Sequence, residues 1–232
     1  MIRLLVFFML FASVGARGDT TLPDDHAALV DDAIAALDSD LARKWSYVES
    51  ATANERTTVG QFDPRRPDGD QWLLLTINGQ APTDAEINTY RESKQKDNDE
   101  SSTDDGNDIR SLVARGSVEF VEETDDYWLF SFIPTDEDED MKILKHVDAS
   151  LRIVKDGRYI DLIDMHNSKP IKPAFGVKIM EFLMRLSFAP ASLDGPVVPQ
   201  TVDVRVRGRA FLLASFDEAE SLAYSDYEYV VD

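Results

Sequence analysis

The sequence contains no cysteine, and this absence excludes several kinds of chemistry at once. Without thiols the protein can form no disulfide, bind no zinc through sulfur and use no thiol nucleophile. A bacterial lipoprotein also needs a cysteine at its cleavage point, so lipidation there is excluded. Histidine is scarce too: His26, His146 and His166 have no motif around them, and no G-x-S-x-G motif is present. The sequence therefore predicts a protein that is not an enzyme and that holds neither a metal nor a cofactor.

Positive charge is also in short supply. The chain has 24 lysines and arginines against 44 aspartates and glutamates, a formal net charge of −20. An excess this acidic repels nucleic acids and anionic lipid headgroups, so we expect no nucleic-acid partner. The 44 acids leave a glycosidase-like carboxylate pair open, although nothing in the pattern singles out two of them.

Long apolar runs are absent except near the start. Residues 4–14 are almost purely apolar, follow the basic Arg3, and lead into the small residues of Val14-Gly15-Ala16. This three-part pattern predicts a cleavable secretory signal peptide over residues 1–16. The run is shorter than the roughly 20 residues that span a bilayer, so we expect no stable membrane anchor. The remainder, residues 17–232, is expected to be one exported domain.

Two helices are predicted from spacing and capping. Apolar residues recur at helical intervals through Leu29, Ala33 and Leu37, which predicts an amphipathic helix over residues 24–42. Thr83-Asp84-Ala85-Glu86 forms a capping box, which predicts a second helix running to about Lys94. The polar, acidic residues 97–108 lack the central glycine and the final glutamate of a calcium loop, so we expect a disordered insertion.

The rest of the chain alternates with the period of β-strands. Short turns between the segments favour antiparallel pairing, because parallel strands need long crossovers. The sequence predicts an α+β fold: one large, curved antiparallel sheet of about ten strands, an unclosed barrel, with the two helices covering one face. The predicted strands cover residues 45–52, 56–62, 71–77, 117–123, 127–133, 142–155, 158–166, 177–188, 201–215 and 224–231.

The dipeptide Asp156-Gly157 indicates a hairpin with a two-residue turn. Such a turn fixes the register of the two strands that it joins. The predicted cross-strand pairs are Leu151 with Leu162, Arg152 with Asp161, and Ile153 with Ile160. The same register places His146 opposite Asn167 and His166 opposite Val147, which directs the two histidines to opposite faces and prevents them from sharing a metal.

Two strand faces are candidates for a site. Alternation places Lys178, Met180, Phe182, Met184, Leu186 and Phe188 on one face, which is either plain core or the lining of a lipid cavity. It also places Arg205, Arg207 and Arg209 together. Arginine forks match carboxylates and other anions, so this stripe is a possible anion site. The alternative is a solvated face whose arginines pair with acids on neighbouring strands.

The order of an N-terminal helix, a three-strand meander, a helix and a long run of antiparallel strands resembles the LolA/LolB-like lipoprotein-carrier fold. The segments 62–64 to 72–74, Gly79 with Pro82-Thr83, and 169–170 to 175–178 are similar to those of uncharacterised exported proteins of Gram-negative bacteria. The resemblance implies an unclosed barrel whose helices form a lid over an apolar cavity. The long acidic insertion departs from a compact carrier.

We therefore expect a periplasmic, non-catalytic protein that binds a lipid or a lipoprotein acyl chain in the concave face of its sheet. The expected lining residues are Trp45, Trp72, Met180, Phe182 and Met184. A cell-envelope interaction module with a filled core is the alternative, and a hydrolase comes third. The sequence leaves the ligand, the partner and the oligomeric state open.

Overall fold

The computed structural model describes residues 24–37, 44–102, 112–113, 115–134, 143–193, 195–211 and 214–230. The predicted signal peptide, residues 1–16, lies outside this part of the chain. The described elements are α1 (Asp24–Ala35), β1 (Trp45–Ala53), β2 (Arg56–Phe62), β3 (Trp72–Ile77), α3 (Asp84–Ser102), η3 (Arg115–Ser117), β4 (Glu119–Glu123), β5 (Tyr127–Phe132), η5 (Leu144–His146), β6 (Asp148–Val154), β7 (Ile160–His166), β8 (Val177–Pro190), β9 (Val197–Ala210) and β10 (Ala214–Tyr229).

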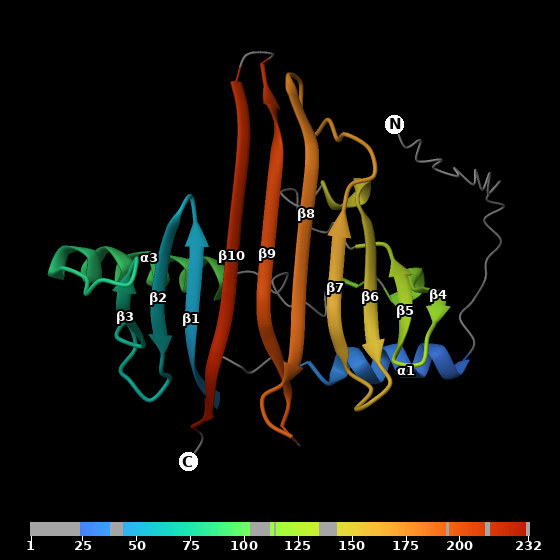
Figure 1. Cartoon of the computed structure of the whole chain (residues 1–232), viewed down its shortest axis with the longest axis horizontal. Coiled ribbons are helices and arrows are strands. Elements are labelled where there is room, and N and C mark those ends of the chain that lie inside the picture. The colour runs from blue at the N-terminus through green and yellow to red at the C-terminus, as the bar shows by residue number, and fades with distance from the viewer. Residues whose placement is uncertain are drawn as a thin grey trace, which may run out of the picture.

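All ten of these strands form a single antiparallel sheet, in the order β3-β2-β1-β10-β9-β8-β7-β6-β5-β4 (Figure 1). The chain ends beside its first strand, since β10 pairs with β1 and inserts the N-terminal meander next to the C-terminal hairpins. β3 and β4 lie at opposite edges, so the sheet is not closed. The predicted α+β class, with about ten strands in one unclosed antiparallel sheet, is confirmed.

The meander and the strands β4, β5 and β7 begin and end close to the predicted positions, whereas β6 begins at Asp148 rather than at residue 142 and the last hairpin differs more. The prediction of one strand over 201–215 and another over 224–231 is wrong, because β9 ends at Ala210 and β10 begins at Ala214. No glycine, proline or asparagine marks this reversal in the sequence. The chain turns at Phe211, whose φ of 49° is unusual for a bulky side chain. Pairing of β9 with β10 over ten positions stabilises the turn instead.

Both helices differ in length from their predictions. α1 ends at Ala35 rather than Ala42, and Leu37 forms an isolated bridge to Val197 of β9. α3 continues to Ser102, so residues 97–102 of the predicted disordered insertion are helical, and residues 103–108 lie outside the described chain. No proline or glycine interrupts the chain between Thr83 and Ser102, which lets the helix propagate.

The predicted capping box at the start of α3 is confirmed. The Glu86 carboxylate accepts hydrogen bonds from the backbone N–H and the hydroxyl of Thr83, each at 2.8 Å. The Thr83 hydroxyl in turn accepts from the backbone N–H of Glu86 at 3.4 Å. These hydrogen bonds from Thr83 lower the pKa of Glu86, and they satisfy donors that the first helical turn leaves open.

The predicted register of the β6–β7 hairpin is wrong along most of its length. Only Ile153 and Ile160 pair as expected; Leu151 pairs with Ile163 and Arg152 with Leu162. The cause is a bulge at Asp161, which adds a residue to β7. The ion pair survives the shift, because Arg152 Nε donates to Asp161 Oδ1 at 2.8 Å.

The histidine positions change for the same reason. Instead of lying in a strand opposite Asn167, His146 belongs to η5, and β6 begins only at Asp148. His166 lies opposite Asp148 rather than Val147, and its Nδ1 is 3.0 Å from Asp164 Oδ1. The described part of the chain brings together no group of three or more His, Asp or Glu side chains that could hold a metal ion.

One face of the sheet, which we call the covered face, carries both helices and nearly all of the apolar core; in Figure 1 the helices lie behind the strands. Under α1, the larger cluster joins Ile34 and Ala33 to side chains of β5–β9, such as Phe130 and Leu151. Under α3, a smaller cluster centres on Tyr47, Phe62 and Trp72. Neither described helix is long and apolar enough to cross a membrane.

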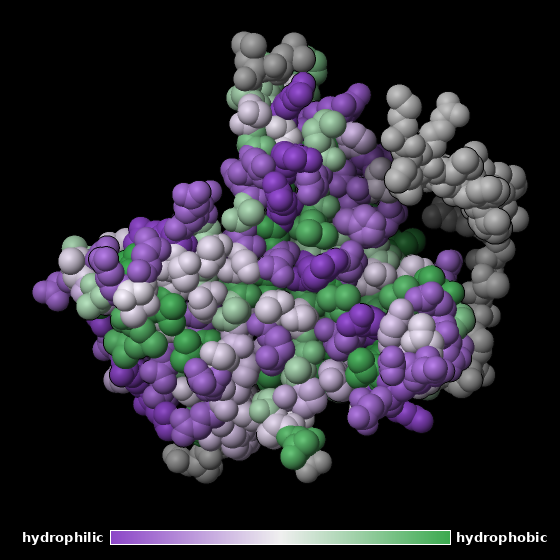
Figure 2. Space-filling view, in the orientation of Figure 1, coloured by the Kyte–Doolittle hydropathy of each residue, from purple (hydrophilic) through white to green (hydrophobic). Residues whose placement is uncertain are grey.

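The opposite face, which we call the open face, carries many of the charged side chains, and Figure 2 looks onto it. Hydrophilic residues gather there over the far ends of β8, β9 and β10 (Figure 2). Their ion pairs include Arg185 with Asp164 at 2.7 Å and Arg207 with Glu181 at 2.6 Å. Such exposed pairs contribute little stability each, so the fold depends mainly on the covered face.

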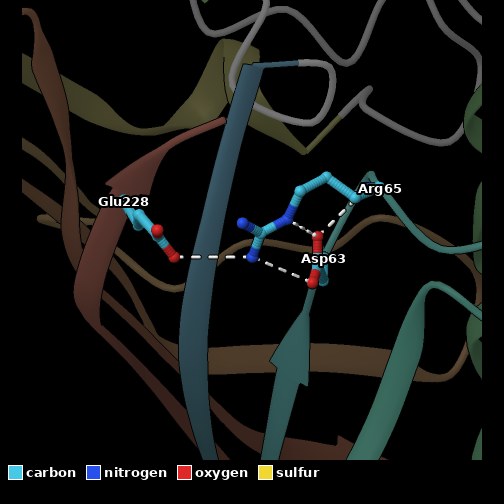
Figure 3. Close-up of polar contacts among 3 residues, drawn as sticks. All are labelled: Asp63, Arg65 and Glu228. Carbon is cyan, nitrogen blue, oxygen red and sulfur yellow. Dashed lines mark hydrogen bonds and ion pairs between the residues drawn. The ribbon is translucent and has the colours of Figure 1, made fainter. Parts of the chain in front are cut away.

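A three-residue contact ties the turn after β2 to the end of the chain (Figure 3). Arg65 Nε donates to Asp63 Oδ1 at 2.8 Å, and its Nη2 lies 3.4 Å from Glu228 Oε2. The hydrogen bonds from Arg65 lower the pKa of Asp63. The cluster links two segments of the sheet that are more than 160 positions apart in sequence.

Candidate functional site

A continuous row of side chains crosses the covered face from the cluster under α1 toward the cluster under α3. From β5 to β1 the directly paired residues are Phe130, Leu151, Ile163, Leu186, Val202, Leu222 and Ala51. Paired residues on one face have Cβ atoms only about 5 Å apart, so these side chains form one apolar surface. The six consecutive strands β5 to β10 and the distant strand β1 contribute to it.

Burial decreases along this row toward the middle of the sheet. Phe130, Leu151 and Ile163 are fully buried beneath α1, and Leu186 is 6% exposed. Val202 and Leu222 are only half-buried, as are Met184 and Val204, which pair with each other in the next row. We call these four residues the central strip. Val204 and Leu222 belong to neither apolar cluster.

The structure distributes the five predicted lining residues over several environments. Phe182 and Met184 lie in or against the cluster under α1, whereas Trp72 lies in the cluster under α3. Trp45 is buried at the end of β1, where its ring is 5.1 Å from that of Tyr229. Only Met184 belongs to the central strip, so these side chains do not meet around one cavity.

Met180 does not share the face that strict alternation predicts. A bulge between Ile179 and Glu181 turns Ile179 toward the core, and Met180 is left 43% exposed. Lys178 is displaced in the same way, while Phe182 returns to the buried face. The sequence holds a signal of this bulge that strict alternation overlooked: the charged residues Lys178 and Glu181 lie three positions apart, so the polar face changes phase between them.

Arg205, Arg207 and Arg209 occupy alternate positions along β9, as the pattern predicts, and the first two of them have acidic partners. Arg207 Nη2 lies 2.6 Å from Glu181 Oε2, and Arg205 Nη2 lies 3.1 Å from Asp217 Oδ2. Hydrogen bonding to Asp217 raises the pKa of Arg205 further. This geometry corresponds to the solvated, acid-paired alternative for Arg205 and Arg207.

The aromatic cluster under α3 holds a buried ion pair that the sequence pattern does not reveal. Lys94 Nζ lies 2.6 Å from Glu49 Oε1, and Glu49 is only 6% exposed. The same ammonium group lies 4.2 Å from the centroid of the Trp72 ring, a cation–π distance. Glu49 and Lys94 are 45 positions apart and come from a strand and a helix. Only docking of α3 on the sheet creates the pair.

Gly60 permits the close approach of α3. A Cβ atom at this position would meet the Tyr90 hydroxyl, with the aromatic carbon behind it at 2.8 Å. Any larger residue would therefore push Tyr90 away from the sheet. The Tyr90 hydroxyl is itself buried, and within the described part of the chain it has no hydrogen-bond partner. In β2, glycine is present because of packing, since its φ is not in the left-handed region.

Burial raises the pKa of four tyrosines in and around this cluster above the usual value of about 10. These are Tyr47, Tyr90, Tyr224 and Tyr227. Loss of hydration is the largest cause in each case. The nearby Glu49 carboxylate adds to the rise for Tyr47, Tyr90 and Tyr224, because it repels a second negative charge.

We therefore expect these four tyrosines to remain protonated beyond pH 10 and to ionise together with unfolding. A raised pKa in the folded state means that the stabilisation is complete below the unfolded pKa of about 10 and is lost as the pH rises above it. The measurement is phenolate absorbance against circular dichroism during an alkaline titration. Titration of all seven tyrosines near pH 10 in a protein that stays folded would contradict this assignment.

Comparison with known proteins adds no relative to these observations. No protein-family model, no curated protein and no solved structure matches the chain. Over its described residues, the protein is an unclosed ten-stranded antiparallel sheet with two α-helices on its apolar face.

Proposed function

We propose that this protein binds a lipid acyl chain, or another apolar chain, across the central strip of its covered face. It acts as a non-catalytic carrier or receptor, is exported, and works in a periplasm. The half-buried central strip carries the proposal, because a fully apolar surface that remains partly open between two covered regions offers a ligand favourable contact area.

The side chains of the central strip suit a ligand of variable shape. Met184 is long and adaptable, while Val202 and Val204 present a flat, stiff surface beside it. Toward the projecting end of β10 the covered face becomes acidic, since Glu220 pairs with Val204 and Glu218 pairs with Val206. These carboxylates favour a ligand whose polar end is neutral or cationic over one that ends in a free carboxylate.

Replacement of Leu222 by glutamate is expected to weaken the binding of a fluorescent long-chain alcohol by tenfold or more. Loss of one buried leucine contact is worth about 2 kcal/mol, and each 1.4 kcal/mol is a factor of ten in affinity. The matched control is Ala223→Glu, which adds the same charge at the next position on the open face. Equal binding by both variants, with equal melting temperatures, would contradict the proposed site.

A cell-envelope interaction module is the second candidate, and the filled clusters favour it. Phe130, Ile163 and Met165 leave no exposed surface, so much of the covered face is solid core. Native mass spectrometry of the protein purified from a Gram-negative periplasm separates the two functions. Co-purified lipid supports a carrier, whereas repeated absence of any bound apolar molecule supports the module.

A further inference from the structure

In the described part of the chain, the end of β10 that follows the last turn has a neighbouring strand on one side only. β9 pairs with β10 from Ala214 onward, whereas the pairing with β1 begins at Glu220, opposite Ala53. Figure 1 shows this part of β10 rising beyond the tip of β1. Among the described residues no strand pairs with the outer side of 214–219. An unpaired edge of this kind can accept an added strand.

The direction of the backbone groups along this edge follows from the paired part of the sheet. The Lys44 carbonyl accepts from Val230, so the even-numbered residues of β1 turn their backbone groups toward β10. Their partners include Ser221, opposite Thr52. By the same alternation, Ser215, Asp217 and Ala219 direct their N–H and C=O groups away from β9, toward the open side.

The open side forms a notch whose floor is the β1–β2 turn. Asn54 and Glu55 make this tight turn, both with positive φ. A groove of about 380 Å³ borders the notch on the open face, and a smaller one of about 190 Å³ borders it on the covered face. Four residues line both grooves: Asn54, Val204, Ala219 and Glu220. Side chains that alternate along an added strand would therefore find space on either face of the sheet.

The charge of the notch selects among possible partners. Its larger groove is lined by four carboxylates, from Glu55, Asp203, Asp217 and Glu220, against the single guanidinium of Arg205. A second copy of this chain would bring its own acidic edge against these groups, within a protein of net charge −20. Like charges on directly paired strands are destabilising, so a basic partner is favoured over self-association.

We propose that an extended, lysine- or arginine-rich peptide segment of another protein binds in this notch as an added strand beside residues 214–219 of β10. Backbone hydrogen bonds to Ser215, Asp217 and Ala219 hold the segment, and the acidic groove selects its basic side chains. The notch borders the central strip at Val204, which lines both grooves, but the proposal does not depend on the proposed binding of an apolar chain.

The test uses the whole exported chain and a synthetic peptide of alternating lysine and valine. We expect measurable binding by isothermal titration calorimetry. A glutamate–valine peptide of equal length should bind at least tenfold more weakly. N-methylation of the backbone along one edge of the lysine–valine peptide should weaken binding at least tenfold, whereas methylation along the other edge should not. Backbone pairing on one side explains this difference, and charge attraction alone does not.

Two variants separate the notch from the rest of the acidic surface. Ala219→Pro removes an outward N–H donor while leaving pairing with β9 possible, and it should weaken peptide binding at least tenfold. The control for the rest of the acidic surface is Glu92→Ala. This substitution removes an exposed carboxylate of α3 and should have no effect on peptide binding. Unchanged binding by folded Ala219→Pro, equal binding of both methylated peptides, or dimerisation of the chain through this edge would overturn the proposal.

Discussion

Substitution of Lys94 by methionine is expected to lower the free energy of unfolding by about 3 kcal/mol, a large effect for a single substitution. The reason lies beneath α3, where the Lys94 ammonium neutralises the almost fully buried Glu49 carboxylate at 2.6 Å. Removal of Lys94 leaves that carboxylate uncompensated among aromatic rings. Because the Lys94 side chain is 19% exposed, solvent reduces the effect toward the lower end of the usual range for buried pairs.

The partner substitution makes this prediction specific. Replacement of both residues, Glu49→Leu with Lys94→Met, should restore most of the lost stability, because the cost arises from an unpaired buried charge rather than from a missing attraction. Urea unfolding followed by tryptophan fluorescence measures Lys94→Met, Glu49→Leu and the double variant, and it yields the coupling energy of the pair.

Arg91→Met supplies the control for this cycle. Arg91 belongs to the same helix and forms a more exposed pair with Asp70 at 3.3 Å. Its removal should change the free energy of unfolding by less than about 1 kcal/mol. A Lys94→Met variant as stable as Arg91→Met, or a double variant less stable than Lys94→Met, would show that the buried pair does not govern the docking of α3.

Truncation of Phe130 to alanine is expected to lower the free energy of unfolding by about 4 kcal/mol. Phe130 is fully buried at the centre of the cluster under α1. Its ring makes edge contacts with Phe120 and His26, at centroid distances of 5.8 and 5.9 Å. Loss of the ring therefore opens a cavity between β5 and α1. Neighbouring side chains can fill this cavity only in part, because strand pairing holds their backbone in place.

Leu129→Ala is the matched control, because Leu129 precedes Phe130 in β5 and points to the open face. It is half-buried, so its truncation should have about a third of the effect. Urea unfolding of both variants measures the difference. Hydrogen exchange in α1 should rise in Phe130→Ala and stay unchanged in Leu129→Ala. Equal destabilisation by the two substitutions would contradict the placement of the apolar core on the covered face.

Features of the fold that depend on residues close together in sequence were predicted correctly more often than features that depend on distant strands. β2 spans the predicted residues, and the capping box at Thr83 has the expected bonds, because both depend on neighbours within a few positions. The β9–β10 turn at Phe211 and the bulge beside Met180 were missed. The strands on either side impose the turn, and no local residue type marks it, whereas the three-residue spacing of Lys178 and Glu181 does mark the bulge.

The candidate site shows the same division. Strict alternation placed Phe182 and Met184 on the covered face, where they lie. It placed Met180 there too, but the bulge near the start of β8 leaves Met180 exposed. Glu49, Lys94 and Gly60 were not singled out by sequence. Acids, lysines and glycines are common in this chain. The roles of these three residues are visible only where α3 contacts the sheet.

By itself the sequence determined that this is a cysteine-free, strongly acidic α+β protein with about ten antiparallel strands, since composition and the period of two are written in adjacent residues. The tertiary structure alone decided that β10 lies beside β1 and that one apolar row crosses seven strands. It also decided that residues 214–219 extend beyond their neighbour. The physical reason is that pairing between distant strands is chosen by the total burial of the covered face, which no short segment encodes.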